Sequence, residues 1–249
     1  MTVRVTDEHL SSYRDFGFCL VKDLIPDDLI SGALSRILQI ADDLADWPAN
    51  HFQILDPSIY TSKTGKPVPM GLQRPGLNEQ VFSAIAEHEN LKSAMSSVLG
   101  GDVELFTEQI GIKHGWIKQE QGGRSYFHQD SWYWKIDPAL GCNCWIPTDS
   151  VDTDAIALAV MPESHLNWTL TEHESYYDDP PWFKATGDLE PFKRHRIVDS
   201  EIDYRKEQLV PMEPGDGLFF TNYTWHRSEP NRTGKTKSFY AIAYQRKQA

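Results

Sequence analysis

The change of texture at Val103 is what most constrains how this chain can fold. Before it, apolar residues recur at helical spacing and predict helices from Thr6 to about Asp15, from Pro26 to about Leu44 and from Gln80 to Val98. After it come short segments rich in β-branched and aromatic residues, separated by turn residues. Helices followed by many short strands favour an antiparallel sandwich or barrel flanked by N-terminal helices.

The strands that we expect are Phe18–Val21, Val103–Lys113, Trp116–Gln119, Cys144–Thr148, Ala155–Met161, Gln208–Pro211, Gly217–Phe220 and Lys237–Gln245. Residues 47–75 are rich in Pro, Gly and Ser and are typical of a loop. Residues 167–206 indicate a long excursion from the sheet, and such excursions in compact domains are usually lids or binding elements. At 249 residues, with 40% hydrophobic residues, the chain suits one domain spanning residues 1–249.

Charge and cysteine content narrow the range of partners. The formal net charge of −12 disfavours nucleic acid or an anionic membrane as a partner, because both bind basic surfaces. The three cysteines form no C-x-x-C pair, and we expect reduced packing residues at Cys142 and Cys144. Neither an apolar signal region nor a membrane-spanning run is seen, so we expect a cytoplasmic protein that acts on a small molecule. The oligomeric state stays open.

One short motif carries metal chemistry. His128 and Asp130 are separated by one residue, so on an extended strand their side chains project from the same face. A second imidazole would complete a two-histidine, one-carboxylate set, which suits non-heme Fe(II) and leaves coordination positions open. His226 follows the Gly-Asp turn and apolar strand at residues 215–220, and is the candidate for that imidazole. The bland alternative is a surface strand pair with an unrelated buried histidine.

At this point the chain resembles the phytanoyl-CoA dioxygenase family of Fe(II)- and 2-oxoglutarate-dependent oxygenases. The matching pieces are the opening at residues 15–21, the block Phe127–Asp130, the turn Met161–His165, the turn Pro214–Asp216 and the stretch His226–Asn231. The resemblance implies a mainly β (α+β) fold, a double-stranded β-helix of the cupin jelly-roll type flanked by N-terminal helices. It also implies that His128, Asp130 and His226 hold the iron.

The same resemblance implies a site for the co-substrate 2-oxoglutarate. The family has an arginine eleven residues after the distal histidine, and here that position is Lys237, which lacks the bidentate guanidinium fork. We favour weaker carboxylate binding by Lys237; the alternatives are a neighbour such as Arg232 or Lys235, or a different 2-oxo acid. Family positions that line the co-substrate site correspond to Ser228, Lys113, Gln109 and Trp145.

The expected function is oxidation, most simply hydroxylation, of a small organic molecule with Fe(II), 2-oxoglutarate and O2, in a setting such as secondary metabolism. Asp130 fills the position that halogenating relatives leave for halide, which disfavours halogenation. Trp132 shares strand parity with the metal ligands and is a candidate substrate contact. His165 is a rival ligand that we expect to be structural. The alternatives are a non-catalytic cupin-like module that binds a metal or ligand, and an iron oxygenase that uses no 2-oxoglutarate.

Overall fold

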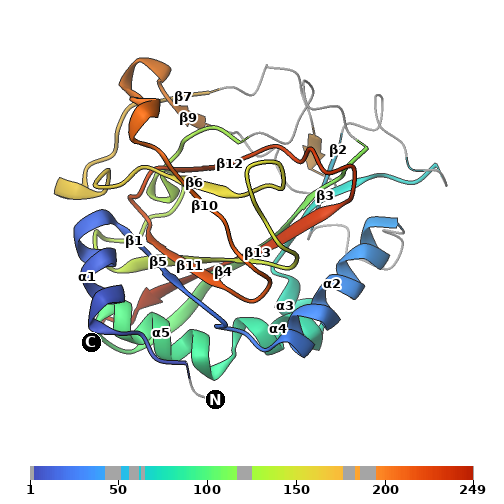
Figure 1. Cartoon of the computed structure of the whole chain (residues 1–249), viewed down its shortest axis with the longest axis horizontal. Coiled ribbons are helices and arrows are strands. Elements are labelled where there is room, and N and C mark those ends of the chain that lie inside the picture. The colour runs from blue at the N-terminus through green and yellow to red at the C-terminus, as the bar shows by residue number, and fades with distance from the viewer. Residues whose placement is uncertain are drawn as a thin grey trace.

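Two antiparallel sheets face each other in this protein, and helices cover the outer side of the larger sheet (Figure 1). The structure is a computed structural model that describes residues 3–42, 52–55, 62, 65–116, 125–175, 183–185 and 195–248. The helices among these residues are α1 (Asp7–Phe16), α2 (Asp27–Asp42), α3 (Pro75–Asn78), α4 (Gln80–Ala86) and α5 (Glu89–Leu99).

The large sheet has the strand order β1-β11-β5-β13-β4-β3-β2-β8. Its strands are β1 (Phe18–Val21), β2 (Phe52–Leu55), β3 (Pro69–Gln73), β4 (Val103–Lys113), β5 (Gly141–Pro147), β8 (Phe183–Ala185), β11 (Gly217–Thr221) and β13 (Lys237–Arg246). The small sheet, of order β10-β6-β12, contains β10 (Gln208–Val210), β6 (Leu158–Val160) and β12 (His226–Ser228). A separate two-stranded sheet of β7 (His173–Ser175) and β9 (His195–Ile197), called the β7–β9 strand pair below, lies beyond the small sheet in Figure 1.

Alternation along the central strands builds two cores. On β5, Cys142 and Cys144 pack into the core beneath the helices, whereas Trp145 packs into the core between the sheets. The outer core contains Phe82, Ile85, Leu91, Ile110, Phe219, Tyr240 and Tyr244. The inner core contains Ile156, Leu158, Val160, Leu218, Phe220 and Ala241. Two facing sheets around the inner core give the jelly roll that we expected.

The N-terminal segment follows the sequence prediction closely. The Thr6 hydroxyl accepts a hydrogen bond from the His9 amide at the start of α1, and Gly17 ends the helix with φ of +89°. A Cβ at Gly17 would lie 2.6 Å from both His165 Nδ1 and Thr224 Oγ1. Glycine is therefore required here for its backbone conformation and for the close approach of neighbouring side chains.

Two predictions of secondary structure are wrong in detail. The single helix expected over residues 80–98 is two helices, because His88 is extended (φ −61°, ψ 138°) and caps α5 through the Asn90 amide. The loop expected over residues 47–75 contains β2 and β3, and β3 pairs with β4 through Gly71 and Gly111. Beyond Trp116 the expected strand at residues 116–119 lies outside the described residues.

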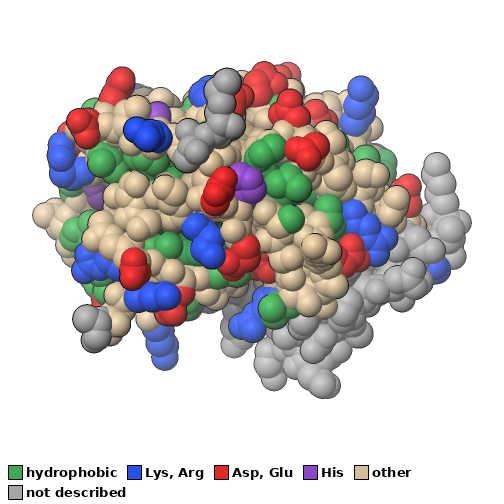
Figure 2. Space-filling model, turned by 90° about the horizontal axis from the view of Figure 1, so that it is seen from below, with side chains coloured by type: hydrophobic (Ala, Val, Ile, Leu, Met, Phe, Trp, Pro, Cys, Tyr) green, Lys and Arg blue, Asp and Glu red, His purple; other side chains and the backbone are tan. Residues whose placement is uncertain are grey.

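The excursion expected over residues 167–206 contains β7, β8 and β9, and β8 returns to pair with β2 at the edge of the large sheet. Among the described residues, no helix is long and apolar enough to cross a membrane. Figure 2 shows the helix-covered face, where acidic and basic side chains are interspersed in the part of the surface that is described.

Candidate metal centre

His128, Asp130 and His226 meet at one point beside the inner core. Each offers a ligand atom, and these atoms all lie within 4.8 Å of one another. Asp130 Oδ1 is 3.6 Å from His226 Nε2, and the two imidazole centroids are 4.3 Å apart. Among the described residues this is the one cluster of three or more such side chains with metal-binding geometry.

The backbone that brings these ligands together is a bridge followed by a 3-10 turn, and not the continuous strand that we expected. His128 and His226 exchange two backbone hydrogen bonds of 3.2 Å, which fixes the two imidazoles side by side. Gln129 is extended (φ −113°, ψ 132°), and the 3-10 helix Asp130–Trp132 begins immediately afterwards. One extended residue is enough to turn His128 and Asp130 toward the same side.

Backbone carbonyls orient both imidazoles. His128 Nδ1 donates to the Tyr126 carbonyl at 2.9 Å, and His226 Nδ1 donates to the Thr224 carbonyl at 3.0 Å. With Nδ1 protonated in this way, Nε2 of each ring is the lone-pair atom. Hydrogen bonding of the second ring nitrogen is how proteins fix the tautomer of a metal-binding histidine.

Burial keeps both imidazoles neutral. It lowers the pKa of His128 to about 3, with repulsion from His226 adding to the effect. Burial likewise lowers the pKa of His226 to about 4. The pKa of Asp130 is raised to about 6 by burial, while His128 and Asn143 oppose the rise. At neutral pH the cluster is thus two neutral imidazoles and a carboxylate, which is the protonation state that binds a divalent cation.

Asp130 is also tied to the large sheet. Its Oδ2 accepts a hydrogen bond of 3.1 Å from Asn143 Nδ2 on β5, and both side chains are buried. Asn143 Oδ1 has no hydrogen-bond partner among the described residues. This residue was missed in the sequence, although it shares strand parity with Trp145, which was selected.

A lysine and two hydroxyls extend from the metal ligands along β12. Lys113 Nζ donates to Ser228 Oγ and to the Glu229 carbonyl, both at 2.6 Å. Ser228 Oγ is 3.0 Å from Ser125 Oγ. Because Ser228 is two residues beyond His226 on the same strand, the ammonium group of Lys113 lies beside the metal centre.

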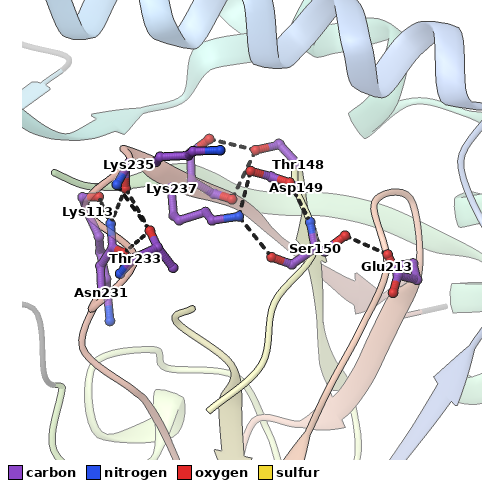
Figure 3. Close-up of polar contacts among 10 residues, drawn as sticks. Lys113, Thr148, Asp149, Ser150, Glu213, Asn231, Thr233, Lys235 and Lys237 are labelled. Carbon is purple, nitrogen blue, oxygen red and sulfur yellow. Dashed lines mark hydrogen bonds and ion pairs between the residues drawn. The ribbon is translucent and has the colours of Figure 1, made fainter. Parts of the chain in front are cut away.

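Lys237 has different partners. It is paired in register with Lys113 across β13 and β4, but its Nζ contacts Asp149 Oδ2 at 2.6 Å and the Ser150 carbonyl at 3.1 Å. Figure 3 shows the Lys237 side chain directed toward Asp149 and Ser150 and away from Lys113. Lys113 therefore contacts the strand of His226, whereas Lys237 is paired with Asp149. Sequence reasoning did not separate the two lysines, because it did not consider Asp149.

Gln109 and Trp145 lie in one row across the sheet. Ala241 of β13 pairs with Gln109 on one side and with Trp145 on the other. Trp145 is buried and stacks on Phe239 at 5.0 Å, and its indole Nε1 has no hydrogen-bond partner among the described residues. Gln109 is exposed and accepts a hydrogen bond of 3.4 Å from Gln73.

Two aromatic residues after the metal motif, Trp132 and Tyr133, pack against the β7–β9 strand pair. Trp132 is 37% exposed and stacks on His173 with ring centroids 4.3 Å apart. Tyr133 lies 6.3 Å from His128 and hydrogen-bonds to the backbone of His195. Since Trp132 belongs to a 3-10 turn, the strand parity by which we selected it does not apply. It still lies near the candidate metal ligands, because it is two residues from Asp130 and stacks on His173 of the β7–β9 strand pair.

Gln129 fixes the segment that leads into the β7–β9 strand pair. Its fully buried amide donates to the carbonyls of Thr169 and Tyr223 at 3.0 and 2.9 Å and accepts from the Thr171 amide at 2.8 Å. The backbone amide of Gln129 donates to His173 Nε2 at 3.2 Å. Sequence reasoning passed over Gln129 because its role depends on segments that are far apart in the chain.

Other histidine and aspartate residues have structural roles. His165 is buried against Gly17, with its Nε2 3.0 Å from the Arg14 carbonyl. Asp216 accepts from the Asp23 and Glu213 amides and pairs with Lys22, which fits the turn role expected for it. Arg124, Lys193, Arg194 and residues 176–182 lie outside the described residues.

The fold and this cluster define a class: a jelly-roll protein with a candidate two-histidine, one-carboxylate metal centre between its sheets. Comparison with known proteins places it more closely, because the profile of the family "Phytanoyl-CoA dioxygenase (PhyH)" matches residues 13–239. The chain belongs to this family. It is accordingly an Fe(II)- and 2-oxoglutarate-dependent dioxygenase that oxidises a small molecule.

Individual relatives are distant. Methylphosphonate hydroxylase of Gimesia maris is 24% identical over 255 residues, covering 98% of this chain and 82% of that protein. The structure of EctD from S. alaskensis with bound Fe superposes with a TM-score of 0.72 at 14% identity, covering 97% of this chain and 77% of that one. The epimerase SnoN, in complex with Fe3+, alpha ketoglutarate and nogalamycin RO, gives 0.68 at 16% identity, covering 96% and 83%.

Proposed function

We propose that this protein hydroxylates a C–H bond of a small organic molecule, with His128, Asp130 and His226 as the iron ligands. The observation that carries the proposal is the convergence of the three side chains with Nε2 of both imidazoles turned away from their backbone partners. Two neutral imidazoles and one carboxylate suit Fe(II) and leave positions open. Iron bound there, together with 2-oxoglutarate and O2, supplies the oxidant.

Lys113 and Ser228 are the residues to which we assign binding of a carboxylate of 2-oxoglutarate. Lys113 supplies a positive charge next to a hydroxyl on the strand that carries His226. Trp145 supports the assignment, because its buried indole N–H has no partner among the described residues and sits on the inner face of the same sheet. A buried donor without an acceptor is costly, so a polar ligand in this space would satisfy it. Lys237 is buried and paired with Asp149, and Gln109 is exposed.

The substrate would bind where the β7–β9 strand pair contacts the 3-10 turn at Asp130–Trp132. Trp132, His173 and His195 form a ring cluster there, with centroid distances of 4.3 and 5.7 Å from Trp132. These aromatic and imidazole rings suit a small, partly apolar molecule. Methylphosphonate is a reasonable first probe, since the Gimesia maris relative is named for its hydroxylation. We propose that the chain forms one cytoplasmic domain that includes this strand pair.

An anaerobic titration tests the proposal at its base. Fe(II) followed by 2-oxoglutarate should produce a weak charge-transfer band in the visible region in the wild-type protein, and none in an Asp130→Ala variant. Addition of air and methylphosphonate, or of another molecule from a panel of secondary metabolites and small acids, should then raise the rate of succinate formation.

Other outcomes would assign a different role. Tight retention of Zn(II) with no succinate formed under any condition would indicate a non-catalytic metal-binding module. Oxidation of a substrate without consumption of 2-oxoglutarate would indicate an iron oxygenase of another type. An Asp130→Ala variant that behaves like the wild type would rule out the ligand set.

A further inference from the structure

The two carboxylate oxygens of Asp130 face different partners. Oδ1 lies 3.6 Å from His226 Nε2, on the side where the ligand atoms converge. Oδ2 accepts the hydrogen bond of 3.1 Å from Asn143 Nδ2. Asp130 is 7% exposed and Asn143 is 5% exposed, so water has little access to compete for either oxygen. One oxygen is thus directed to the metal position and the other is occupied.

Asn143 lies on β5, an interior strand of the large sheet. Its strand β5 pairs with β11 on one side and β13 on the other, and Asn143 itself is opposite Phe220 and Ala243. Because both neighbours hold the backbone, the donor cannot follow the carboxylate if the carboxylate turns. The amide nitrogen must be the atom facing Asp130, since the carboxylate is an acceptor only.

The number of oxygens that a carboxylate gives to a metal determines how many positions remain. Carboxylates bind divalent cations through one oxygen or through two. With two imidazoles and one oxygen, an octahedral ion keeps three positions for other ligands; with both oxygens bound, it keeps two. A chelating 2-oxo acid uses two positions, so O2 can be accommodated only in the first case.

We propose that Asn143 is a positioning residue that keeps Asp130 a one-oxygen ligand by holding Oδ2 in a hydrogen bond. This rests on the proposed function, since it requires that the cluster bind iron. Asn143 Oδ1 adds an independent observation: it is a buried acceptor without a partner among the described residues, as Trp145 Nε1 is a buried donor two residues along. Both atoms indicate that this stretch of β5 faces a polar ligand.

The test replaces the donor by an apolar side chain that branches at the same carbon. Asn143→Leu removes the hydrogen bond to Asp130. Asn222→Leu is the matched control, because Asn222 is equally buried and donates to Ser131 Oγ at 2.6 Å, next to Asp130 but not to it. Each protein is loaded anaerobically with Fe(II), and infrared difference spectra are recorded with aspartate labelled with 13C at the carboxylate.

We expect the wide separation between the asymmetric and symmetric carboxylate stretches, typical of one-oxygen binding, in the wild type and in Asn222→Leu. The separation should narrow in Asn143→Leu. Because two positions still suffice for 2-oxoglutarate, its anaerobic affinity should be retained in Asn143→Leu, whereas the rate of succinate formation in air should fall about 10–100-fold, the range of activity lost when a residue that orients a metal ligand is replaced.

An unchanged separation in iron-loaded Asn143→Leu overturns the proposal, as does equal narrowing in both variants. Should Asn143→Leu not fold, Asn143→Ala is measured in the same way. A wild type that takes up no Fe(II) would instead overturn the proposed function, together with this proposal.

Discussion

Two lysines that face each other on neighbouring strands show how a single contact changes the interpretation of a residue. Position 237 drew attention because the family has an arginine there, and the chain offers Lys237. In the structure, Asp149 neutralises Lys237, while Lys113 reaches the hydroxyl of Ser228. The charge of a lysine can be interpreted only together with its partner, and these partners lie 88 residues from Lys237 and 115 residues from Lys113 in the chain.

Replacing each lysine by methionine separates these roles. Lys113→Met should raise the KM for 2-oxoglutarate by roughly 10–100-fold, since a hydrogen bond to a charged group contributes about 1.5–3 kcal/mol. Lys237→Met should change this KM by no more than a few-fold and should mainly lower stability. Succinate formation at varied 2-oxoglutarate concentration measures the first effect, and urea unfolding the second. A larger KM effect at Lys237 than at Lys113 would return the co-substrate to the position first expected.

Glu108 gives a prediction that depends on pH. Its carboxyl group accepts from the Gly76 amide at 2.7 Å and from the Tyr240 hydroxyl, and burial raises its pKa above the ordinary value of 4.5. The folded state thus binds the proton more tightly than the unfolded state does. Stability from this group is present below pH 4.5 and is lost as pH rises through the raised pKa.

Glu108→Gln keeps the shape and removes the titration. We expect its free energy of unfolding, relative to the wild type, to improve as pH increases from about 4.5 upward. Urea unfolding at a series of pH values measures the difference. Glu104→Gln is the control on the same strand, because Glu104 is exposed. Parallel pH curves for wild type and Glu108→Gln would show that Glu108 is not the titrating group.

At the scale of elements, the buried side-chain amide of Gln129 helps to attach the β7–β9 strand pair to the metal motif, together with the hydrogen bonds of Tyr133 to the His195 backbone. Gln129→Glu should loosen this attachment, because a carboxylate oxygen would then face the carbonyl oxygens of Thr169 and Tyr223. Leaving buried groups unpaired costs about 1–3 kcal/mol. Faster amide hydrogen exchange over residues 169–175 is the expected signature. The half-buried Gln245, which bonds to Glu104, gives the control variant Gln245→Glu. Equal exchange over residues 169–175 in both variants would contradict the attachment.

Local patterning predicted the elements that local interactions determine. Helix α1, with its Thr6 cap and Gly17 end, and strand β4, with both bounds, were found in this way. The failures have a common cause: β3 is a strand because it pairs with β4, and β12 is a strand because it pairs with β6. Neither partner is nearby in the sequence. The cluster of His128, Asp130 and His226 that we propose as the iron site was selected by chemistry and resemblance, whereas Asn143 and Gln129 could be recognised only from contacts across the fold.

At the scale of the whole molecule, the candidate metal centre joins the small and large sheets, which the hydrogen bond from Lys113 to Ser228 also links. His226 belongs to the small sheet, and Asp130 is tied to the large sheet through Asn143. The unfolded chain cannot bring these ligands together, so a cation that binds the centre binds the folded state. At a metal concentration of about one hundred times the Kd, such binding stabilises by about 2.7 kcal/mol.

For a chain of this size, that energy raises the melting temperature by roughly 5–10 °C. Thermal unfolding with and without Fe(II) under anaerobic conditions should show the increase in the wild type. Asp130→Ala should abolish it, since a ligand is lost. His165→Gln should melt at a lower temperature than the wild type and still show the full increase, because His165 bonds to the Arg14 carbonyl and lies outside the cluster. If His165→Gln lost the increase while Asp130→Ala kept it, the rival histidine would be the ligand, and the small and large sheets would not be joined at Asp130.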